Sequence, residues 1–368
     1  MKKLWFPVLL AAMLVALCVP ASSFDSSVPP SERSVILFSW DGAQRDHVNE
    51  CLSRSELPNL AALIAEGKMV NIDISGHATD TKAGHTQTLT GYDPELTGVY
   101  SNSKFQAIPE GLTIFERLEK AFGDDNITTI MVTGKTHHIG SCPPSTPEQI
   151  ADAEKQLEEM AAAKPKAANN AAQPGEEKTG IADPDAAAQA AKRRQALTQN
   201  LKQIIQNSAG EPWYLVHKNF DVWDGEKGRD NTVVGPLMMG YLDQYGKGRF
   251  FAYYHFSDPD HKGHNHGENS KEYNDAIIAC DDWLGKIVGK LKEMGAYDKT
   301  MVFVTADHGF DEGKTSHSDA PYVVLAGNVK TLTKDGHMRD ITPTLLTEMG
   351  VDISKIEPKY SGVVLTAK

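Results

Sequence analysis

The chain has 368 residues, 40% hydrophobic and 23% charged, which is ordinary globular composition and excludes a fully disordered chain, a collagen and a multi-span membrane protein. It carries 37 Lys and Arg against 49 Asp and Glu, a net charge of -12. Since no basic patch or stripe stands out, we do not expect binding to a nucleic-acid duplex. The length fits two domains, or one large α/β domain with an insertion.

The first 23 residues have the pattern of a secretory signal peptide. Lys2 and Lys3 supply a positive start, residues 8–19 form a short apolar run, and small residues at 21–23 offer a cleavage site. The apolar run is too short to span a bilayer comfortably. We therefore predict export, to a bacterial periplasm, with residues 24–368 as the mature chain and no stable membrane anchor after cleavage. An uncleaved N-terminal anchor is the alternative.

Three cysteines remain after residue 23, namely Cys51, Cys142 and Cys280. An odd number allows at most one internal disulfide, and the sequence does not assign it. No pair has CxxC spacing, which argues against a thiolate metal site.

Short apolar runs alternate with helical stretches along the chain. The runs lack the alternation of a half-exposed strand, so we predict strands covered on both faces, as in a parallel sheet. The predicted strands are residues 34–39, 127–132, 250–256, 301–305 and 322–325. The predicted helices are residues 57–66, 114–122, 273–294 and 341–349, with glycines at the C-cap positions 67, 295 and 350. This order predicts a doubly wound α/β sheet.

Residues 148–206 differ from the rest because they are rich in Ala, Glu, Lys and Gln and are interrupted by prolines. We predict helices at 148–163 and 186–206 around a flexible tract at 164–185. Such an insertion is either a solvated excursion or a cap over an active-site mouth. Aromatic residues follow it, and they form either a wall for a leaving group or the packing of the insertion onto the body. They are Trp213, Tyr214, Trp223 and Tyr245.

Polar residues follow four of the predicted strands directly. Asp41 follows the first, residues 134–138 (GKTHH) the second, residues 258–264 (DPDHKGH) the third, and Asp307 with His308 the fourth. One Asp after a strand is usually a turn residue or an N-cap, but several Asp and His residues in this register are hard to explain as turns. In open α/β sheets the ligand site lies beyond the carboxyl ends of the strands.

These residues form two sets of potential metal ligands. Asp260 and His264 are four residues apart, so both can reach one ion from a single tight turn, and His317 follows in a polar loop. We assign Asp260, His264 and His317 to one ion. We assign Asp41, Asp307 and His308 to the other. Mixed imidazole and carboxylate ligands favour zinc over calcium or magnesium, and two zinc ions suit an in-line phosphoryl displacement.

Thr81 is the candidate nucleophile. It lies in residues 79–85 (TDTKAGH), which precede residues 86–91 (TQTLTG), and we consider it as a hydroxyl at a helix N-terminus. The N-terminus of a helix favours an anion such as phosphate. A hydroxyl bound to zinc loses its proton more readily. From composition alone, a Thr here is more often an N-cap than a nucleophile.

Together these motifs resemble the alkaline phosphatase superfamily. The matching pieces, in the family's order, are Asp41-Gly42, Thr81-x-x-Gly84-His85 with Thr90-Gly91, Asp260-x-x-x-His264, Asp307-His308-Gly309 and His317-x-x-Ala320-Pro321. The resemblance implies an α/β/α sandwich with a largely parallel sheet. It also implies that Thr81 forms a covalent phospho-threonine, that the zinc held by Asp41, Asp307 and His308 activates Thr81, and that the other zinc activates water.

The ligand set resembles the phosphatases and the nucleotide pyrophosphatase/phosphodiesterases, while other features resemble the sulfatases. Residues 134–140 (GKTHHIG) look like the sulfatase Gly-Lys-x-His-x-Gly signature with one extra residue. The spacing from Thr81 to Thr90-Gly91 also matches that branch. However, Thr81 cannot become the formylglycine of a sulfatase. Where the phosphodiesterase branch has an Asn phosphate donor, this chain has Gly84.

Lys135 and His137 are the candidate phosphate-binding side chains, with the backbone N–H of Gly84 as a further donor. A dianionic monoester gains more from a lysine than a monoanionic diester does. We therefore expect a phosphomonoesterase acting on a small phosphate ester. The alternatives are a phosphodiesterase or nucleotide pyrophosphatase, a sulfate or phosphonate ester hydrolase using the same metals, and a non-catalytic anion- or partner-binding protein.

Overall fold

The computed structural model describes residues 23–162, 184–225 and 228–367. The predicted signal peptide, apart from residue 23, and most of the predicted flexible tract lie outside these residues. Among the residues described, no helix is long and apolar enough to cross a membrane.

The described residues form an eight-stranded central sheet, in the order β4-β3-β5-β1-β6-β7-β2-β8. β7 runs antiparallel to both of its neighbours, and all other adjacent pairs are parallel. The bounds are β1 Ser34–Trp40, β2 Lys68–Asp73, β3 Thr128–Thr133, β4 Val222–Asp224, β5 Phe250–Phe256, β6 Thr300–Thr305, β7 Tyr322–Gly327 and β8 Gly336–His337. The largely parallel sheet that the sequence predicts is confirmed.

The burial of each strand explains whether it could be predicted from the sequence. β1, β5 and β6 lie at the centre of the sheet and every one of their residues is buried, which requires continuous apolar runs. All five predicted strands are present. The prediction missed β2, which alternates between buried and exposed residues, and the very short β4 and β8.

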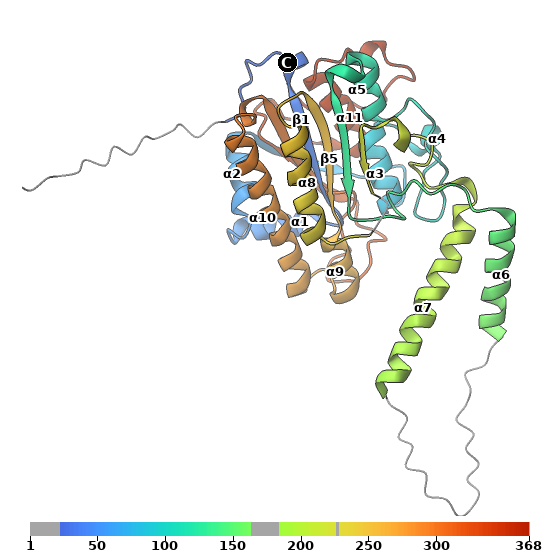
Figure 1. The fold of residues 1–368 in the computed structure, drawn as a ribbon. Coiled ribbons are helices and arrows are strands. Elements are labelled where there is room, and N and C mark those ends of the chain that lie inside the picture. The colour runs from blue at the N-terminus through green and yellow to red at the C-terminus, as the bar shows by residue number, and fades with distance from the viewer. Residues whose placement is uncertain (1–22, 163–183, 226–227, 368) are drawn as a thin grey trace, which may run out of the picture.

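Two helical layers cover the sheet (Figure 1). One layer contains α1, α2, α8 and α10, and α10 packs against both α2 and α8; the other contains α3, α5 and α11, in which α11 packs against α3 and α5. The bounds are α1 Arg45–Ser53, α2 Pro58–Glu66, α3 Thr81–Thr90, α4 Pro94–Thr97, α5 Ile114–Phe122, α6 Pro147–Ala162, α7 Pro184–Gln206, α8 Asn231–Tyr245, α9 Asp258–His266, α10 Lys271–Glu293 and α11 Ile341–Glu348. The predicted α/β/α sandwich is therefore confirmed.

The four predicted body helices correspond to α2, α5, α10 and α11, within two residues at each end. Gly295 and Gly350 follow the last two of these helices with φ angles of +66° and +87°, the left-handed conformation that ends a helix at glycine. The prediction missed α8, which carries Pro236 in its interior. It also treated residues 258–264 as a tight turn, whereas they belong to α9.

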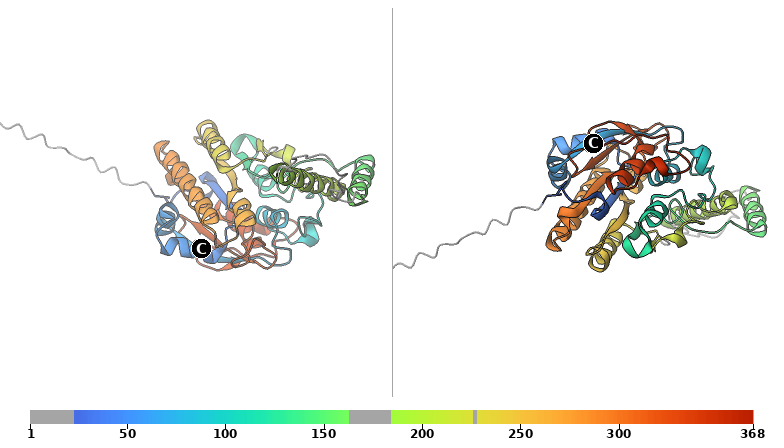
Figure 2. Two further views of the ribbon diagram at one scale, coloured as in Figure 1. Left: turned by 90° about the horizontal axis from the view of Figure 1, so that it is seen from below. Right: turned by 90° about the horizontal axis from the view of Figure 1, so that it is seen from above.

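The insertion is a helical hairpin. Its helices α6 and α7 pack against each other and project away from the sandwich in all three ribbon views (Figures 1 and 2). At the base, the Ser145 N–H donates to the Asn207 carbonyl across 2.8 Å, and the Glu211 N–H donates to the Cys142 carbonyl across 3.0 Å. The ends of the hairpin are thereby joined at the edge of the body.

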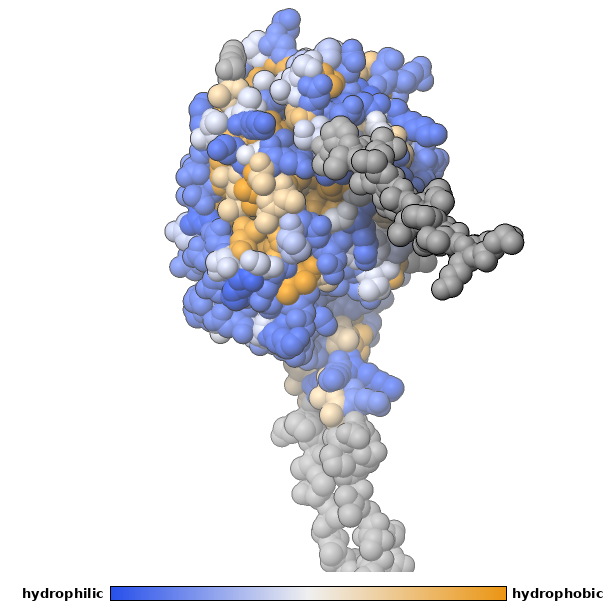
Figure 3. Space-filling model, turned by 90° about the vertical axis from the view of Figure 1, so that its left-hand side faces the viewer, coloured by the Kyte–Doolittle hydropathy of each residue, from blue (hydrophilic) through white to orange (hydrophobic). Residues whose placement is uncertain are grey.

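Trp213, which follows the hairpin, belongs to the core, and Trp223 and Tyr245 are partly buried against it. Trp213 is fully buried, and its ring lies 6.4 Å from that of Phe115 and 6.1 Å from that of Trp223. These contacts make Trp213 part of the packing of the body, and they involve neither α6 nor α7 of the insertion. The described cysteines form no disulfide with one another. The side of the molecule seen in Figure 3 is largely hydrophilic, with one hydrophobic patch near its centre.

Candidate active site and metal centre

One set of potential ligands gathers at the carboxyl ends of two neighbouring strands. Asp41 follows β1, and Asp307 and His308 follow β6. All three side chains are fully buried. Their ligand atoms lie within 4.8 Å of one another. The structure thus brings this predicted set together.

The second set lies beside the first. Asp260 and His264 occupy successive turns of α9, and His264 Nε2 is 3.3 Å from Asp260 Oδ1. His317 comes from the loop before β7, and its Nε2 is 3.2 Å from that of His264. The helical i,i+4 spacing, rather than a tight turn, points Asp260 and His264 in the same direction.

Backbone carbonyls orient the three imidazoles. In each of them Nδ1 donates to a carbonyl: His264 to Thr315, His308 to Gly309 and His317 to Thr79. Each Nε2 lone pair therefore faces the ligand sets. Burial and nearby His308 lower the pKa of His317 to about 4, so this imidazole is neutral, the form that binds metal. The Nε2 atoms of His264 and His317 lie 3.2 Å apart, so their lone pairs are separated either by a proton on His264, whose pKa the nearby Asp260 carboxylate raises, or by a metal cation.

The carboxylates also have unused binding capacity. Asp41 Oδ1, Asp260 Oδ1 and Asp307 Oδ2 are buried and accept no hydrogen bond from the described residues. Burial and the nearby charge of Asp41 raise the pKa of Asp307 well above its usual range. Buried carboxylate oxygens of this kind are expected to bind a metal or to be protonated. The donor set therefore fits divalent metal ions.

Lys135 lies between the two ligand sets. Its Nζ is 2.8 Å from Asp41 Oδ2 and 2.6 Å from Asp260 Oδ2. Burial opposes the charge on this lysine, but the surrounding carboxylates raise its pKa above the usual range, so it stays protonated. The ammonium uses one oxygen of each of these two carboxylates and leaves the other oxygen for a metal.

Thr81 is the first residue of α3, and Asp80 is the N-cap. The Thr81 hydroxyl is 3.3 Å from His308 Nε2 and 3.3 Å from Lys135 Nζ. The side chain is almost fully buried. The predicted nucleophile therefore touches a member of one ligand set and the lysine that joins both.

Gly84 does not have the predicted role. Its N–H donates to the Asp80 carbonyl across 2.8 Å as part of the first turn of α3, so it does not face a phosphate. A Cβ at this position would lie 2.2 Å from the Asp307 carbonyl oxygen. Gly84 instead allows α3 to approach the strand end that carries Asp307. The prediction of Gly84 as a phosphate donor was wrong because it did not account for helix hydrogen bonding.

Asn102 supplies a side-chain amide at the same end of α3. Its side-chain Oδ1 accepts a hydrogen bond from the backbone N–H of Lys82 across 2.9 Å. Its backbone N–H donates to Asp80 Oδ2 across 2.8 Å. The sequence analysis missed Asn102 because it stands in a polar loop with no periodic or motif signal.

His137 lies on the wall of a cavity of about 620 Å³ that also contacts Lys135, Asp260 and His264. Burial lowers the pKa of the His137 imidazole. Of the two predicted phosphate-binding side chains, Lys135 therefore reaches Thr81, whereas His137 lines the adjoining cavity.

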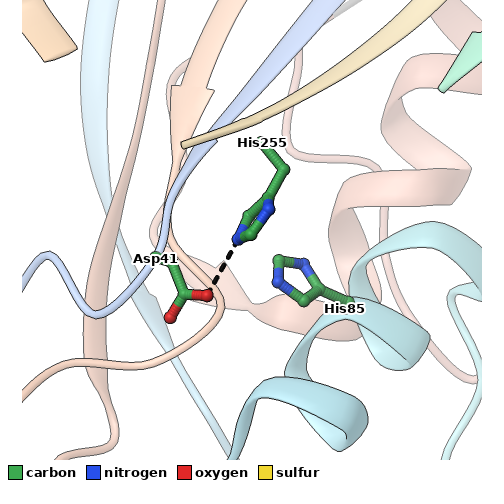
Figure 4. Close-up of side chains that lie close together, drawn as sticks. All are labelled: Asp41, His85 and His255. Atoms are coloured by element: carbon green, nitrogen blue, oxygen red, sulfur yellow. Dashed lines mark hydrogen bonds and ion pairs between the residues drawn. The ribbon is translucent and has the colours of Figure 1, made fainter. Parts of the chain in front are cut away.

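Two further histidines, His85 and His255, lie next to the predicted metal ligands (Figure 4). The Gly134 N–H donates to His255 Nδ1, so His255 Nε2 carries the proton and donates to Asp41 Oδ2 across 2.8 Å. His85, on α3, places Nε2 3.4 Å from Asp307 Oδ2. Asp41, His85 and His255 lie close enough to hold an ion. However, the hydrogen bond from His255 to Asp41 occupies that space, so His255 positions this carboxylate, whereas His85 Nε2 makes no hydrogen bond with Asp307.

Comparison with known proteins identifies the family of this chain. The family described as type I phosphodiesterase / nucleotide pyrophosphatase matches residues 35–361. The bis(5'-adenosyl)-triphosphatase ENPP4 of Homo sapiens is 23% identical over 292 residues, which is 79% of this chain and 50% of that protein. The 2,3-bisphosphoglycerate-independent phosphoglycerate mutase of Wolbachia pipientis wMel is 35% identical over 107 residues, 26% of this chain and 20% of that protein. The chain spans half or less of the length of these relatives.

Solved structures of other proteins share the α/β/α sandwich architecture. The putative sulfatase yidJ from Bacteroides fragilis matches with a TM-score of 0.53 and 14% identity, over 92% of this chain and 79% of that one. The lipoteichoic acid synthase LtaP from Listeria monocytogenes matches with a TM-score of 0.51 and 12% identity, over 92% and 75%. At these identities the likeness concerns the fold alone. The family match extends over residues 35–361, and the chain belongs to the type I phosphodiesterase / nucleotide pyrophosphatase family of the alkaline phosphatase superfamily.

Proposed function

We propose that this protein is an exported, two-zinc phosphoric ester hydrolase that uses Thr81 as its nucleophile and prefers phosphomonoesters. The observation that carries the proposal is the position of the Thr81 hydroxyl, 3.3 Å from both His308 Nε2 and Lys135 Nζ, at the start of a helix. Asp41, Asp307 and His308 would hold one zinc, with Thr81 as a further ligand, and Asp260, His264 and His317 would hold the other. Three imidazoles among six protein ligands favour zinc.

In the proposed reaction, Thr81 Oγ1 attacks phosphorus and the bond to the leaving-group oxygen breaks. Water then releases phosphate from the phospho-threonine. Bound zinc supplies Lewis acidity, which promotes loss of a proton from a hydroxyl or water and neutralises phosphate charge. The Lys135 ammonium stabilises negative charge on Oγ1, and the N-terminus of α3 favours the phosphate oxygens. The Asn102 amide provides the side-chain donor that Gly84 lacks.

Charge supports a monoester substrate. While Thr81 Oγ1 is still protonated, three buried carboxylates, one ammonium and two divalent ions would leave a net charge of plus two. A monoester dianion neutralises this charge completely, and a diester monoanion neutralises half of it. The lysine held between Asp41 and Asp260 therefore favours the monoester.

The second candidate is hydrolysis of phosphodiesters or pyrophosphates. It is favoured by the description of the family and by the named activity of the ENPP4 relative. Hydrolysis of sulfate or phosphonate esters and non-catalytic anion binding remain alternatives that the same experiment separates.

The test is parallel turnover of nitrophenyl phosphate, bis-nitrophenyl phosphate, nitrophenyl sulfate and a nitrophenyl phosphonate by zinc-loaded protein. We expect the monoester to have the highest kcat/KM. Thr81→Ala should lose most turnover while retaining zinc, and Thr81→Ser should keep activity because it preserves the hydroxyl. Mass spectrometry of acid-quenched enzyme should find phosphate on Thr81. Full activity of Thr81→Ala would exclude the covalent mechanism, and zinc binding without turnover of any ester would favour a binding protein.

Export has a separate test. Cell fractionation should recover the protein in the periplasm with its N-terminus near residue 24. Full-length protein in the membrane fraction would instead support the uncleaved anchor.

A further inference from the structure

The cavity beside the metal ligands is bounded on one side by the insertion. Its walls include residues 134–138 after β3, the α9 residues Asp260, His261 and His264, and the last turns of α7. The hairpin otherwise projects into solvent (Figures 1 and 2). Only the end of α7 near the body thus lies where a group attached to the phosphate would extend.

The α7 residues on this wall occupy one face of the helix. They are Gln199, Lys202, Gln203 and Gln206. Their spacing of three and four residues places them side by side along successive turns. This face presents three amides and one ammonium to a cavity that also contacts Lys135.

We propose that this face of α7 binds the leaving group of the substrate, and that the leaving group is a hydroxyl-rich sugar or polyol. The inference rests on the proposed phosphoric ester hydrolysis and names the class of ester. It gives the base of the insertion a role in specificity, while the other described residues of the hairpin do not line the cavity.

Hydrogen-bonding capacity supports this choice. Each glutamine offers an acceptor oxygen and two N–H donors, and Lys202 offers three donors. Burial lowers the pKa of His137, so its neutral imidazole adds one donor and one acceptor near neutral pH. Hydroxyl groups both donate and accept, so a sugar or polyol satisfies such a wall. An apolar leaving group would displace water from this wall without replacing its hydrogen bonds, above all at the half-buried Gln203.

The wall is poorly suited to a nucleobase. None of the described residues that line the cavity is Phe, Tyr or Trp. Trp213, which follows the insertion, packs elsewhere, with its ring edge-on to Phe115 and Phe220 and tilted against Trp223. Binding of a base usually uses an aromatic face for stacking. The polar wall therefore favours a carbohydrate-like group over a nucleoside.

The test compares two esters that share the phosphate and differ in the leaving group. Glucose 6-phosphate and phenyl phosphate are used if the wild-type enzyme prefers monoesters, and the corresponding glucosyl and phenyl diesters are used if it prefers diesters. The measured quantity is the ratio of kcat/KM for the sugar ester to kcat/KM for the phenyl ester. Intrinsic leaving-group reactivity cancels when this ratio is compared between variants.

We expect Gln203→Leu to lower this ratio about fivefold, as for loss of one or two neutral hydrogen bonds. Lys202→Met should also lower it. The matched control is Gln195→Leu, which alters an exposed glutamine on the same helix that does not line the cavity, and should leave the ratio unchanged. An unchanged ratio in both Gln203→Leu and Lys202→Met would overturn the inference.

Failure of the proposed function gives a different result. In that case the wild-type protein would turn over neither the phenyl ester nor the sugar ester. Turnover of the phenyl ester with a ratio insensitive to α7 would leave the proposed hydrolysis intact and reject the leaving-group site. A preference for adenosine monophosphate over glucose 6-phosphate that depends on Gln203 would also reject the sugar or polyol class.

Discussion

His255 donates its Nε2–H to Asp41 Oδ2 across 2.8 Å, and the backbone N–H of Gly134 fixes the tautomer that makes this possible. The strand end that precedes Lys135 is thereby linked to the carboxylate that Lys135 also contacts. His255 therefore acts as a positioning residue for Asp41, because the hydrogen bond orients Oδ1 toward His308, 3.5 Å away.

The first prediction concerns this hydrogen bond. His255→Ala should weaken zinc binding by Asp41, Asp307 and His308 about 10–100-fold, the usual effect of losing a partner behind a metal ligand. His255→Gln should restore part of the affinity because its amide can donate to Asp41. Competition with a chelator measures the affinity, and circular dichroism checks folding. The control is His266→Ala, which changes an exposed histidine; wild-type affinity in His255→Ala would refute the role.

The second prediction concerns the contact between Gly84 and Asp307. Gly84→Ala places a Cβ 2.2 Å from a backbone carbonyl oxygen, which cannot move without shifting the strand end. We expect a loss of about 1–3 kcal/mol in the free energy of unfolding, together with weaker zinc binding. The control is Gly240→Ala in α8, where nothing lies within 4 Å of the new Cβ. That substitution should be neutral or stabilise by about 0.5–1 kcal/mol. Equal unfolding curves for the two variants would contradict this account.

The sequence predicted the parts of the molecule that depend on local pattern. Continuous apolar runs identified β1, β5 and β6 because these strands are buried on both faces. The same strand ends then placed Asp41 and Asp307 next to each other. β2 was missed because it is only half buried and alternates.

The residue roles that could not be predicted from the sequence depend on contacts between distant segments of the chain. Gly84 has its role because Asp307, more than two hundred positions away, packs against it. His255 stands inside a continuous apolar run, and its polar contacts come from the distant Asp41 and Gly134. Asn102 gave no pattern at all, and only the fold brings it to the start of α3. In each case the role depends on a contact between two residues that only the folded chain brings together.

The third prediction concerns Lys135 and metal removal. Without zinc, the ammonium is the cation that directly contacts the buried Asp41 and Asp260. Lys135→Met keeps a similar volume but leaves those carboxylates uncompensated, which should destabilise the metal-free protein by about 3–5 kcal/mol. Zinc should offset part of that loss. The fall in Tm on adding a chelator should therefore be larger in Lys135→Met than in the wild type.

The comparison needs a lysine variant that leaves the site untouched. The control is Lys286→Met, which changes an exposed lysine on α10. The fall in its Tm on adding a chelator should match that of the wild type. If Lys135→Met responded to the chelator no more than Lys286→Met does, Lys135 would not be the compensating cation.

The last prediction concerns a buried pair that anchors the loop before His317. His47 Nδ1 lies 2.8 Å from Glu268 Oε1, and Glu268 Oε2 accepts the Gly313 N–H across 3.0 Å. Burial opposes a charge on His47, but the contacts with Cys51 and Glu268 raise its pKa to about 10. Because the folded pKa exceeds the unfolded value near 6.5, the stabilisation is complete below pH 6.5 and is lost as the pH rises through 10.

The free energy of unfolding of zinc-saturated protein should therefore fall by about 1–3 kcal/mol between pH 6.5 and 10. Denaturant titrations across this range measure it. His47→Gln should be less stable than the wild type at pH 6.5 and should show a flatter pH dependence, because it cannot carry the charge. His266→Gln should retain the wild-type slope, since that histidine is exposed. A slope in His47→Gln equal to that of the wild type would mean that the pH dependence arises elsewhere and that the His47–Glu268 pair contributes no proton-linked stability to the loop carrying His317.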